Sequence, residues 1–341
     1  MSENPAAVDG SSGGTGANSG GAGDTGGPGE GSGDTGGPGE RSGDAGGPGE
    51  VIVEATGLTK QFDGSDPVVE NVDLTIHEGE TTMLVGPNGA GKTVLLCCLA
   101  GGLEPSAGTV EVFGRPPREA QSQFVFTLQD GLAVDELSGR ENAAFYTRLH
   151  PAATDRWTEV ADRLALDEAA LDRRVGDYSG GMTRKLELAV TLSVDVPLYV
   201  LDEPTAALDP GAVERFHAIL DELAAAGRTV VATSHAPRDL RVADRLVFVG
   251  ENGLLADGSP ETLRASVPPV VVADDTRRVE TPEEVVTDGR LFDTDSGRRG
   301  FLASDADRAS VAAREDVVEV TDPTAADTFN YFVHLQTERD Y

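Results

Sequence analysis

The sequence predicts an α/β fold with a parallel β-sheet at its core, and three observations support this prediction. Short continuous apolar runs, bounded by glycine and aspartate, alternate with segments of helical periodicity. Continuous apolar runs are typical of parallel strands, because helices cover such strands on both faces. A glycine-rich loop also joins one apolar run to a helix, and two acidic residues end another. The chemistry is therefore expected at the ends of buried strands.

The individual elements can be assigned along the chain. Order is expected to begin at Val51, where VIVEA alternates like a strand. Further strands are predicted at 81–85 (TTMLV), 123–128 (QFVFTL), 198–201 (LYVL) and 229–234 (TVVATS), and helices at 93–100 and 211–225. Between about 131 and 176 the strand pattern stops, and the runs RENAAFYTRL and DRWTEVADRLAL predict a helical insert in the α/β core.

Composition divides the chain into three parts. Residues 1–50 contain three tandem glycine-rich decapeptides with no apolar face to bury, which predicts a disordered tail. Residues 51–268 hold the α/β core, and the composition changes after Pro269. Residues 269–341 are expected to form a small accessory α/β domain, with candidate strands VVVA and VVEV and helical stretches near 306–315 and 324–336.

The charge balance excludes several classes of protein. The chain has 27 Lys and Arg against 59 Asp and Glu, a formal net charge of −32, so a nucleic-acid partner is not expected. No run of apolar residues is long enough to span a bilayer, and no secretory signal is visible, which favours a cytoplasmic protein. Lysine occurs only at Lys60, Lys92 and Lys185, and such acid-rich, lysine-poor surfaces resemble those of proteins from salt-accumulating halophiles.

The strongest motif is the loop GPNGAGKT between the strand at 81–85 and the helix at 93–100, which fits G-x-x-x-x-G-K-[ST]. Its glycines let the backbone wrap phosphates, and its N–H groups point inward at the positive end of the helix. Lys92 is expected to reach the β- and γ-phosphates of a nucleotide, and the Thr93 hydroxyl to bind Mg²⁺. The candidate nucleotide-binding residues are Gly86, Pro87, Asn88, Gly89, Ala90, Gly91, Lys92 and Thr93.

Two adjacent carboxylates follow the LYVL strand. Asp202 ends the strand beside the phosphate loop, where it can hold Mg²⁺ through water. Glu203 comes next and is placed to orient or deprotonate an attacking water molecule. One carboxylate near the metal and a second near the water predict a hydrolytic site.

Further motifs occur in order along residues 51–265: an aromatic residue in TKQFDG, a glutamine after QFVFTL, YSGGM before a helix, DEPTAALD after LYVL, and a histidine after TVVATS. In these motifs the sequence resembles the ATP-binding cassette (ABC) ATPases, whose signature is usually written LSGGQ. The resemblance implies a P-loop NTPase fold of the ABC type, with antiparallel N-terminal strands beside the parallel core. The matching residues are Phe62, Gln129, Ser179, Gly180, Gly181, Asp202, Glu203, Asp209 and His235.

The resemblance implies a role for each of these residues. Two cassettes would dimerise head to tail around two ATP molecules, most simply as a homodimer. The Ser-Gly-Gly core of one signature would cap the γ-phosphate held by the partner, because a helix N-terminus suits an anion. The other implied roles are adenine stacking by Phe62, sensing of the metal and water by Gln129, polarisation of water by Glu203, contact with the γ-phosphate by His235, and a D-loop or helix-capping role for Asp209.

The resemblance also implies that the chain is the ATPase subunit of a transporter. A separate multi-spanning permease would dock on the insert at 131–176, and would hold the cassette on the inner face of the cell membrane. Tyr178 and Met182 replace the Leu and Gln of the signature, as in some export-type cassettes similar to drug, polysaccharide or antibiotic-efflux ATPases. Ala-Pro after His235 departs from the acidic helix of many such exporters. Export is preferred, with an importer cassette or a soluble non-transport ABC ATPase as alternatives.

Overall fold

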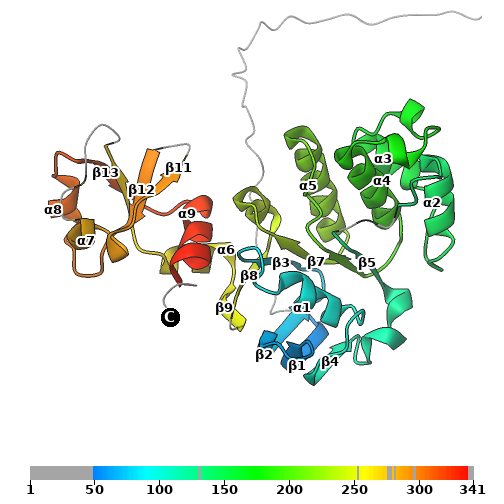
Figure 1. Cartoon of the computed structure of the whole chain (residues 1–341), viewed down its shortest axis with the longest axis horizontal. Helices are drawn as coiled ribbons and strands as arrows, with labels where there is room; N and C mark the ends of the chain where they lie inside the picture. Colours follow the sequence, from blue (N-terminus) through cyan, green and yellow to red (C-terminus); the bar gives the residue numbers. More distant parts are fainter. Residues whose placement is uncertain are drawn as a thin grey trace, which may run out of the picture. The chain divides into compact units, whose positions relative to one another are not determined.

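The structure of the chain is a computed structural model that describes residues 49–336 except 130, 132, 252, 275–278, 280–281 and 295–296. Apart from its last two positions, the predicted tail at 1–50 lies outside the described residues. In the described part of the chain the strands form three sheets (Figure 1).

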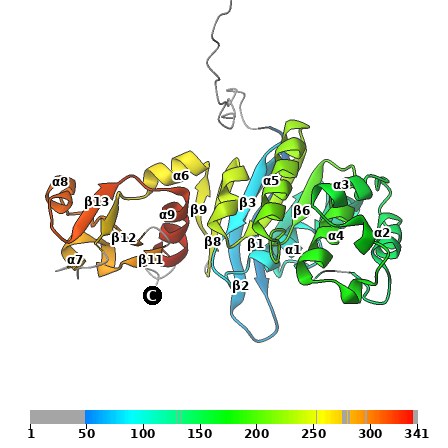
Figure 2. The same cartoon turned by 90° about the horizontal axis from the view of Figure 1, so that it is seen from above.

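The largest sheet has six strands in the order β5-β6-β7-β3-β8-β9. Figure 2 labels β9, β8, β3 and β6 of this sheet. The neighbouring strands β5, β6, β7, β3 and β8 are parallel, and β9 pairs with β8 antiparallel at one edge of the sheet. This confirms the parallel core that the apolar runs predict. The strands are β3 (Thr81–Val85), β5 (Phe124–Thr127), β6 (Leu198–Leu201), β7 (Thr229–Ser234), β8 (Arg245–Gly250) and β9 (Gly253–Gly258).

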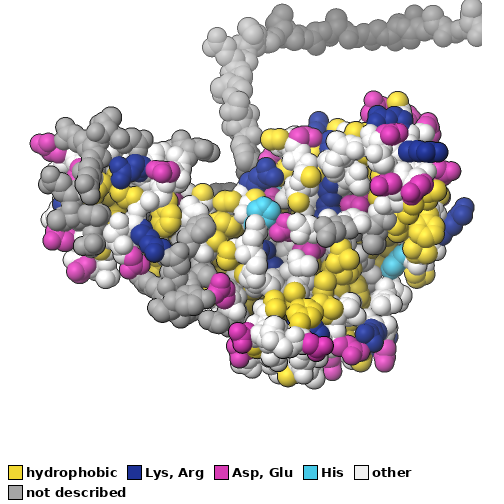
Figure 3. All heavy atoms as spheres, viewed as in Figure 1, with side chains coloured by type: hydrophobic (Ala, Val, Ile, Leu, Met, Phe, Trp, Pro, Cys, Tyr) yellow, Lys and Arg dark blue, Asp and Glu magenta, His cyan; other side chains and the backbone are white. Residues whose placement is uncertain are grey.

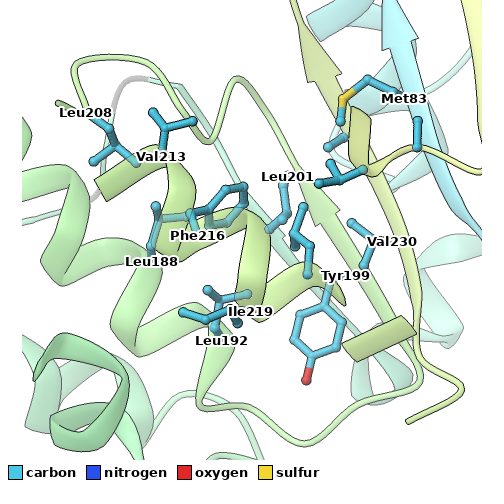
Figure 4. Close-up of a cluster of buried hydrophobic side chains, with 14 of the residues drawn as sticks. Met83, Leu188, Leu192, Tyr199, Leu201, Leu208, Val213, Phe216, Ile219 and Val230 are labelled. Atoms are coloured by element: carbon cyan, nitrogen blue, oxygen red, sulfur yellow. The ribbon is translucent and has the colours of Figure 1, made fainter. Parts of the chain in front are cut away.

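Helices cover this sheet on both faces. In β3, Met83 and Val85 belong to one apolar cluster and Leu84 to another, because successive side chains of a strand point to opposite faces. The first cluster includes residues of α4 (Gly180–Leu192) and α5 (Pro210–Ala225), and Figure 4 shows their side chains meeting those of the sheet. The second includes residues of α1 (Lys92–Leu99).

The second sheet is antiparallel, with the order β2-β1-β4, as the resemblance implies for the N-terminal strands. Its strands are β1 (Val51–Gln61), β2 (Pro67–His77) and β4 (Ala107–Val112). Leu58 of β1 and Ile76 of β2 are fully buried in the same cluster as α1. The sheet therefore packs over the helix that follows the phosphate loop.

The insert is helical, as predicted, but one of its helices is shorter than the sequence pattern. It contains α2 (Gly139–Thr147), α3 (Trp157–Arg163) and the 3₁₀ helices η3 (Glu168–Ala170) and η4 (Val175–Asp177). The prediction extended α3 to residue 166, which is wrong. Ala165 has φ +55°, and the Leu166 N–H donates to the Ala161 carbonyl, which closes the helix end.

The third sheet lies in the C-terminal part of the chain, is antiparallel, and has the order β11-β12-β10-β13. The predicted strands VVVA and VVEV are β10 (Val270–Ala273) and β13 (Val317–Thr321); β11 (Phe292–Thr294) and β12 (Gly297–Phe301) were not predicted. The helices here are α6 (Pro260–Ser266), α7 (Pro282–Val285), α8 (Arg308–Ala312) and α9 (Ala325–Asn330), which continues as a π-helix at Tyr331–Gln336.

The remaining short elements are 3₁₀ helices on the connections: η1 (Pro117–Glu119), η2 (Gln121–Gln123), η5 (Pro237–Val242) and η6 (Thr287–Gly289). In the residues described, every helix is too short or too polar to cross a bilayer.

Candidate functional site

The candidate site lies where three neighbouring parallel strands end. Strands β6, β7 and β3 are adjacent and parallel, so their carboxyl ends meet at one edge of the sheet. The phosphate loop follows β3, the two acidic residues follow β6, and His235 follows β7. Gln129 follows β5, which pairs with β6. The fold thus brings the ends of four predicted segments to the same edge.

The phosphate loop adopts a conformation that depends on glycine. Gly89 has φ +90° and Gly91 has φ +85°, and residues with a side chain rarely adopt such angles. The Lys92 ammonium lies inside the loop and donates to the carbonyls of Gly86 and Pro87, both at 2.9 Å. Burial lowers the pKa of Lys92, while the carboxylates of Glu203 and Asp202 oppose that shift. A buried cation within a loop of this shape suits the phosphates of a nucleotide.

Asp202 is fully buried and is held beside the loop by two hydroxyls. Its Oδ1 accepts from Thr93 Oγ1 at 3.2 Å and from Thr233 Oγ1 at 2.6 Å. Its Oδ2 is buried and has no hydrogen-bond partner within the described part of the chain. Leaving a buried carboxylate oxygen unpaired is costly, and oxygen atoms are the ligands that Mg²⁺ prefers. Thr93 and Asp202 therefore fit a magnesium ion.

Glu203 sits in an unusual backbone conformation with its carboxylate beside the predicted histidine. Its φ is +43°, and its N–H donates to Thr233 Oγ1 at 2.7 Å. Its Oε1 lies 3.1 Å from His235 Nδ1. The Glu203 side chain is 10% exposed and that of His235 is 48% exposed. The pair thus places a nearly buried carboxylate next to a histidine that solvent or a ligand can reach.

The signature residues begin helix α4, on the insert side of the sheet. Ser179 is the N-cap of this helix and accepts from the Met182 N–H at 3.3 Å. Gly180 and Gly181 form its first turn, where unpaired N–H groups favour an anion. Within the residues described, no hydrogen bond joins Ser179 or Gln129 to the phosphate loop of the same chain.

Two further predicted residues lie at the surface. Phe62 is 43% exposed, and Lys60 Nζ lies 5.2 Å from the centroid of its ring, a cation–π contact. Asp209 is the N-cap of α5, because its carboxylate accepts from the Ala212 N–H at 2.9 Å. The Lys185 ammonium at 3.0 Å and that N–H hold the pKa of Asp209 below its usual value. The predicted capping role of Asp209 is thus present in the structure.

Sequence reasoning missed Arg184, which lies on the buried side of α4. Its side chain is 5% exposed, and its guanidinium donates to the carbonyls of residues 202, 203 and 204. Burial lowers the pKa of Arg184 and Glu187 opposes the shift, but an arginine remains charged. The available signal was its position, since Arg184 shares the helical stripe of Leu188, Thr191 and Leu192, where an apolar residue is expected.

A second missed feature is the buried Asp239 in η5. Its carboxylate accepts from Thr205 Oγ1 at 2.7 Å, from Ser234 Oγ at 2.6 Å and from His217 Nε2 at 3.0 Å. Burial would raise the pKa of Asp239, but these hydrogen bonds outweigh it and leave that pKa lowered. Arg241 Nε, which can only donate, faces His217 Nδ1, so Nε2 carries the proton toward Asp239. The network ties the segment after Glu203 to the residue before His235.

A groove of about 380 Å³ runs between the edge of the sheet and the insert. Its lining is mostly apolar and comes from β5, α2 and α4, with Phe126, Tyr146, Leu149 and Val190 among the side chains. Leu149 is 65% exposed and Phe145, in α2, is 48% exposed. Figure 3 shows hydrophobic side chains gathered on this part of the surface. Exposed apolar side chains beside a groove are typical of a protein interaction site.

The fold and these residues define a P-loop nucleotide hydrolase, and comparison with known proteins gives its family. The family model described as "ABC transporter" matches residues 69–206. The Nod factor export ATP-binding protein I of Rhizobium sp. (strain N33) is 37% identical over 62% of this chain and 72% of its own length. The daunorubicin/doxorubicin resistance ATP-binding protein DrrA of Streptomyces peucetius is 33% identical over 63% of this chain and 67% of its own.

Solved structures agree with the fold. The ATP-binding subunit of an ABC transporter superposes with a TM-score of 0.56 at 23% identity, covering 63% of this chain and 92% of that one. The dimeric cassette MJ0796 bound to ADP and phosphate gives a TM-score of 0.55, covering 61% and 98%. The chain belongs to the ABC transporter family and is an ATP-binding, ATP-hydrolysing subunit.

Proposed function

We propose that the edge formed by β3, β6 and β7 hydrolyses Mg-ATP through the residues that converge there. The phosphate loop and Lys92 bind the β- and γ-phosphates, and Thr93 and Asp202 would hold Mg²⁺, which when bound neutralises charge that develops on the phosphates. Glu203 orients water and accepts its proton. His235 is exposed enough to donate to the γ-phosphate. The observation that carries this proposal is the unpaired, buried Asp202 Oδ2 beside Thr93, next to the Glu203–His235 pair.

The site needs a second cassette for completion. Ser179, Gly180 and Gly181 open α4, and in the described chain Ser179 has no hydrogen bond to the phosphate loop. Capping of ATP by the signature of a second copy would supply donors where charge develops, so that hydrolysis depends on dimerisation. Gln129 and the exposed Phe62 are proposed to contact the water or metal and the adenine, respectively. MJ0796 is a cassette whose solved structure is dimeric, which supports this proposal.

We propose that the groove between β5 and the insert receives a cytoplasmic helix of a separate permease. Its lining includes Leu128 and Gly131, on either side of Gln129 in the sequence, so a change sensed by Gln129 can reach the bound helix. Its apolar lining and the exposed Leu149 suit the apolar face of a short helix. The cassette would then be cytoplasmic and peripheral at the membrane. The relatives named for export and drug resistance favour export over import, with the permease selecting the cargo.

The domain organisation is proposed on the same basis. Residues 51–268 would form the nucleotide-binding cassette and 269–341 an accessory domain, since the C-terminal sheet pairs only with its own strands among the residues described.

The permease proposal is tested by pulling the tagged full-length chain from gently solubilised native membranes in molar KCl and identifying the proteins that accompany it. A multi-spanning membrane protein is expected with the wild type and is expected to be lost with Leu149→Glu. Val318→Glu is the matched control, because Val318 is also 65% exposed but lies on β13. Equal recovery with both variants would contradict the groove as the docking site. A soluble partner in place of a membrane protein would contradict the transport function.

A further inference from the structure

Hydrogen bonds join helix α4, which begins with the signature, to the turn that carries Glu203. The Arg184 guanidinium, one turn after the signature, donates to the carbonyls of Asp202 at 2.6 Å, Glu203 at 3.1 Å and Pro204 at 3.3 Å. It also donates to the Leu128 carbonyl at 3.0 Å, directly before Gln129. One buried side chain therefore joins the signature helix, the Glu203 turn and the end of β5.

Two further contacts join α4 to the residues that follow the Glu203 turn. A Cβ on Gly181 would lie 2.8 Å from the Ala207 carbonyl oxygen, so the helix start and this segment are in backbone contact. Lys185 Nζ lies 3.0 Å from Asp209 Oδ2. Together with Arg184, these contacts hold the first two turns of α4 against residues 202–209 at three points. The signature and the Glu203 segment are thus expected to move together.

Glu203 depends on such support because its backbone is strained. At φ +43° the residue lies in the left-handed region, which a side chain disfavours because its Cβ comes too close to the following carbonyl oxygen. Its N–H is fixed by Thr233 and its carbonyl by Arg184. Both peptide groups beside this Cα are therefore held by buried side chains, which fixes the direction in which the Glu203 side chain leaves the backbone.

We propose that Arg184 is a positioning residue that fixes Glu203 of its own subunit relative to the signature helix of that subunit. This rests on the proposed roles of Glu203 and the signature. Because the signature caps the ATP of the opposite site, engagement there sets the position of the water-activating carboxylate in this chain's own site. Arg184 thus couples the two ATP sites of a dimer. A planar guanidinium can serve several carbonyls in fixed directions, and a lysine ammonium cannot.

The test compares Arg184→Lys with the wild type in the full-length chain. We expect the variant's kcat to fall at least about tenfold while its KM for ATP stays within about threefold, because binding groups are untouched. The Hill coefficient for ATP should fall toward one. In a Glu203→Gln background, ATP-dependent dimers should persist with Arg184→Lys. Arg163→Lys is the matched control, since Arg163 pairs with Glu222 at the surface of the insert, and its kcat should be unchanged.

Mixed dimers show whether Arg184 positions Glu203 of its own subunit or supports the signature that caps ATP in the opposite site. Two tags allow isolation of dimers in which one subunit carries Glu203→Gln and still holds ATP, so that ATP turns over only in the other subunit's site. Arg184→Lys in the subunit that keeps Glu203 should reduce turnover strongly, and in the Glu203→Gln subunit only weakly. The reverse pattern, or a loss of ATP binding and dimerisation equal to the loss of kcat, would overturn the proposal. Normal turnover by Glu203→Gln would instead overturn the proposed base, which separates the two failures.

Discussion

The nucleotide-binding edge and the C-terminal sheet are both built from short strands, but their polar groups are arranged differently. In the six-stranded sheet the parallel strands β3, β6 and β7 end together, and their following residues converge. In the antiparallel C-terminal sheet neighbouring strands end at opposite edges. Arg299 of β12 pairs instead with the buried Asp327 of α9 at 2.9 Å. Parallel topology gathers chemistry at one edge, whereas the C-terminal sheet supplies packing.

The two regions nevertheless share one apolar cluster. Phe329 of α9 and Phe332 of the π-helix pack against Phe248 of β8, with ring centroids 6.5 and 4.6 Å apart. Helix α9 also contacts η5, which begins two residues after His235. The C-terminal part is therefore joined to the cassette beside the segment that carries the histidine.

The largest expected effect is on the folding of both regions together, and it follows from the net charge of −32. Self-repulsion is screened only at high ionic strength, where the Debye length falls to about 3 Å at 1 M salt. We expect the chain to lose its cooperative fold in dilute buffer and to regain it in molar KCl. Circular dichroism across a KCl titration measures this. Two separate transitions would show that the shared cluster does not make the regions cooperative, and full stability without salt would contradict the prediction.

The next effect is confined to the nucleotide-binding edge. Glu203→Gln keeps the shape of the side chain but removes the proton acceptor, so we expect turnover to fall about a thousandfold. ATP-bound dimers should remain, since the phosphate loop and the signature are intact. Steady-state ATP hydrolysis and size-exclusion chromatography with ATP measure the two properties. Retained ATPase activity would remove Glu203 from the role of base.

The sequence predicts this edge far better than it predicts the contacts that support it. The phosphate loop and the acids after LYVL are local patterns, and β3, β6 and β7 occupy the predicted residues. Arg184 and Asp239 bind partners on several distant segments, which no local pattern reveals. In the C-terminal part, β12 was not predicted because its sequence GRRGF contains no apolar alternation.

The third prediction tests the contact between the regions. Phe332 is 4% exposed, and its ring packs against that of Phe248. Because Phe332→Ala would leave a cavity there, we expect it to lower the free energy of unfolding by about 3–5 kcal/mol. Urea unfolding in molar KCl measures the change. Val318→Ala is the control and should change stability by less than about 0.5 kcal/mol, because that side chain is 65% exposed. Equal effects would show that the C-terminal part does not stabilise the cassette.

The smallest effect belongs to Asp209, at the end of the segment that α4 contacts. Because Lys185 and the Ala212 N–H lower its pKa, the charged form stabilises the folded state above the unfolded pKa of about 3.9. That contribution is lost as the pH falls through the lower pKa of the folded state. Asp209→Asn keeps the cap and removes the ion pair. The stability difference between wild type and variant should therefore be constant near neutral pH, begin to fall below about pH 4, and vanish only below the lowered pKa of the folded state.

Urea unfolding midpoints at a series of pH values measure this difference. The same comparison in a Lys185→Gln background is the control, since removal of the ammonium takes away the largest cause of the lowered pKa. A difference that persists unchanged at low pH, or that is equally large without Lys185, would show that the charge of Asp209 does not join α4 to α5. The link between the signature helix and the segment after Glu203 would then depend on Arg184 and on the close approach of Gly181 to Ala207.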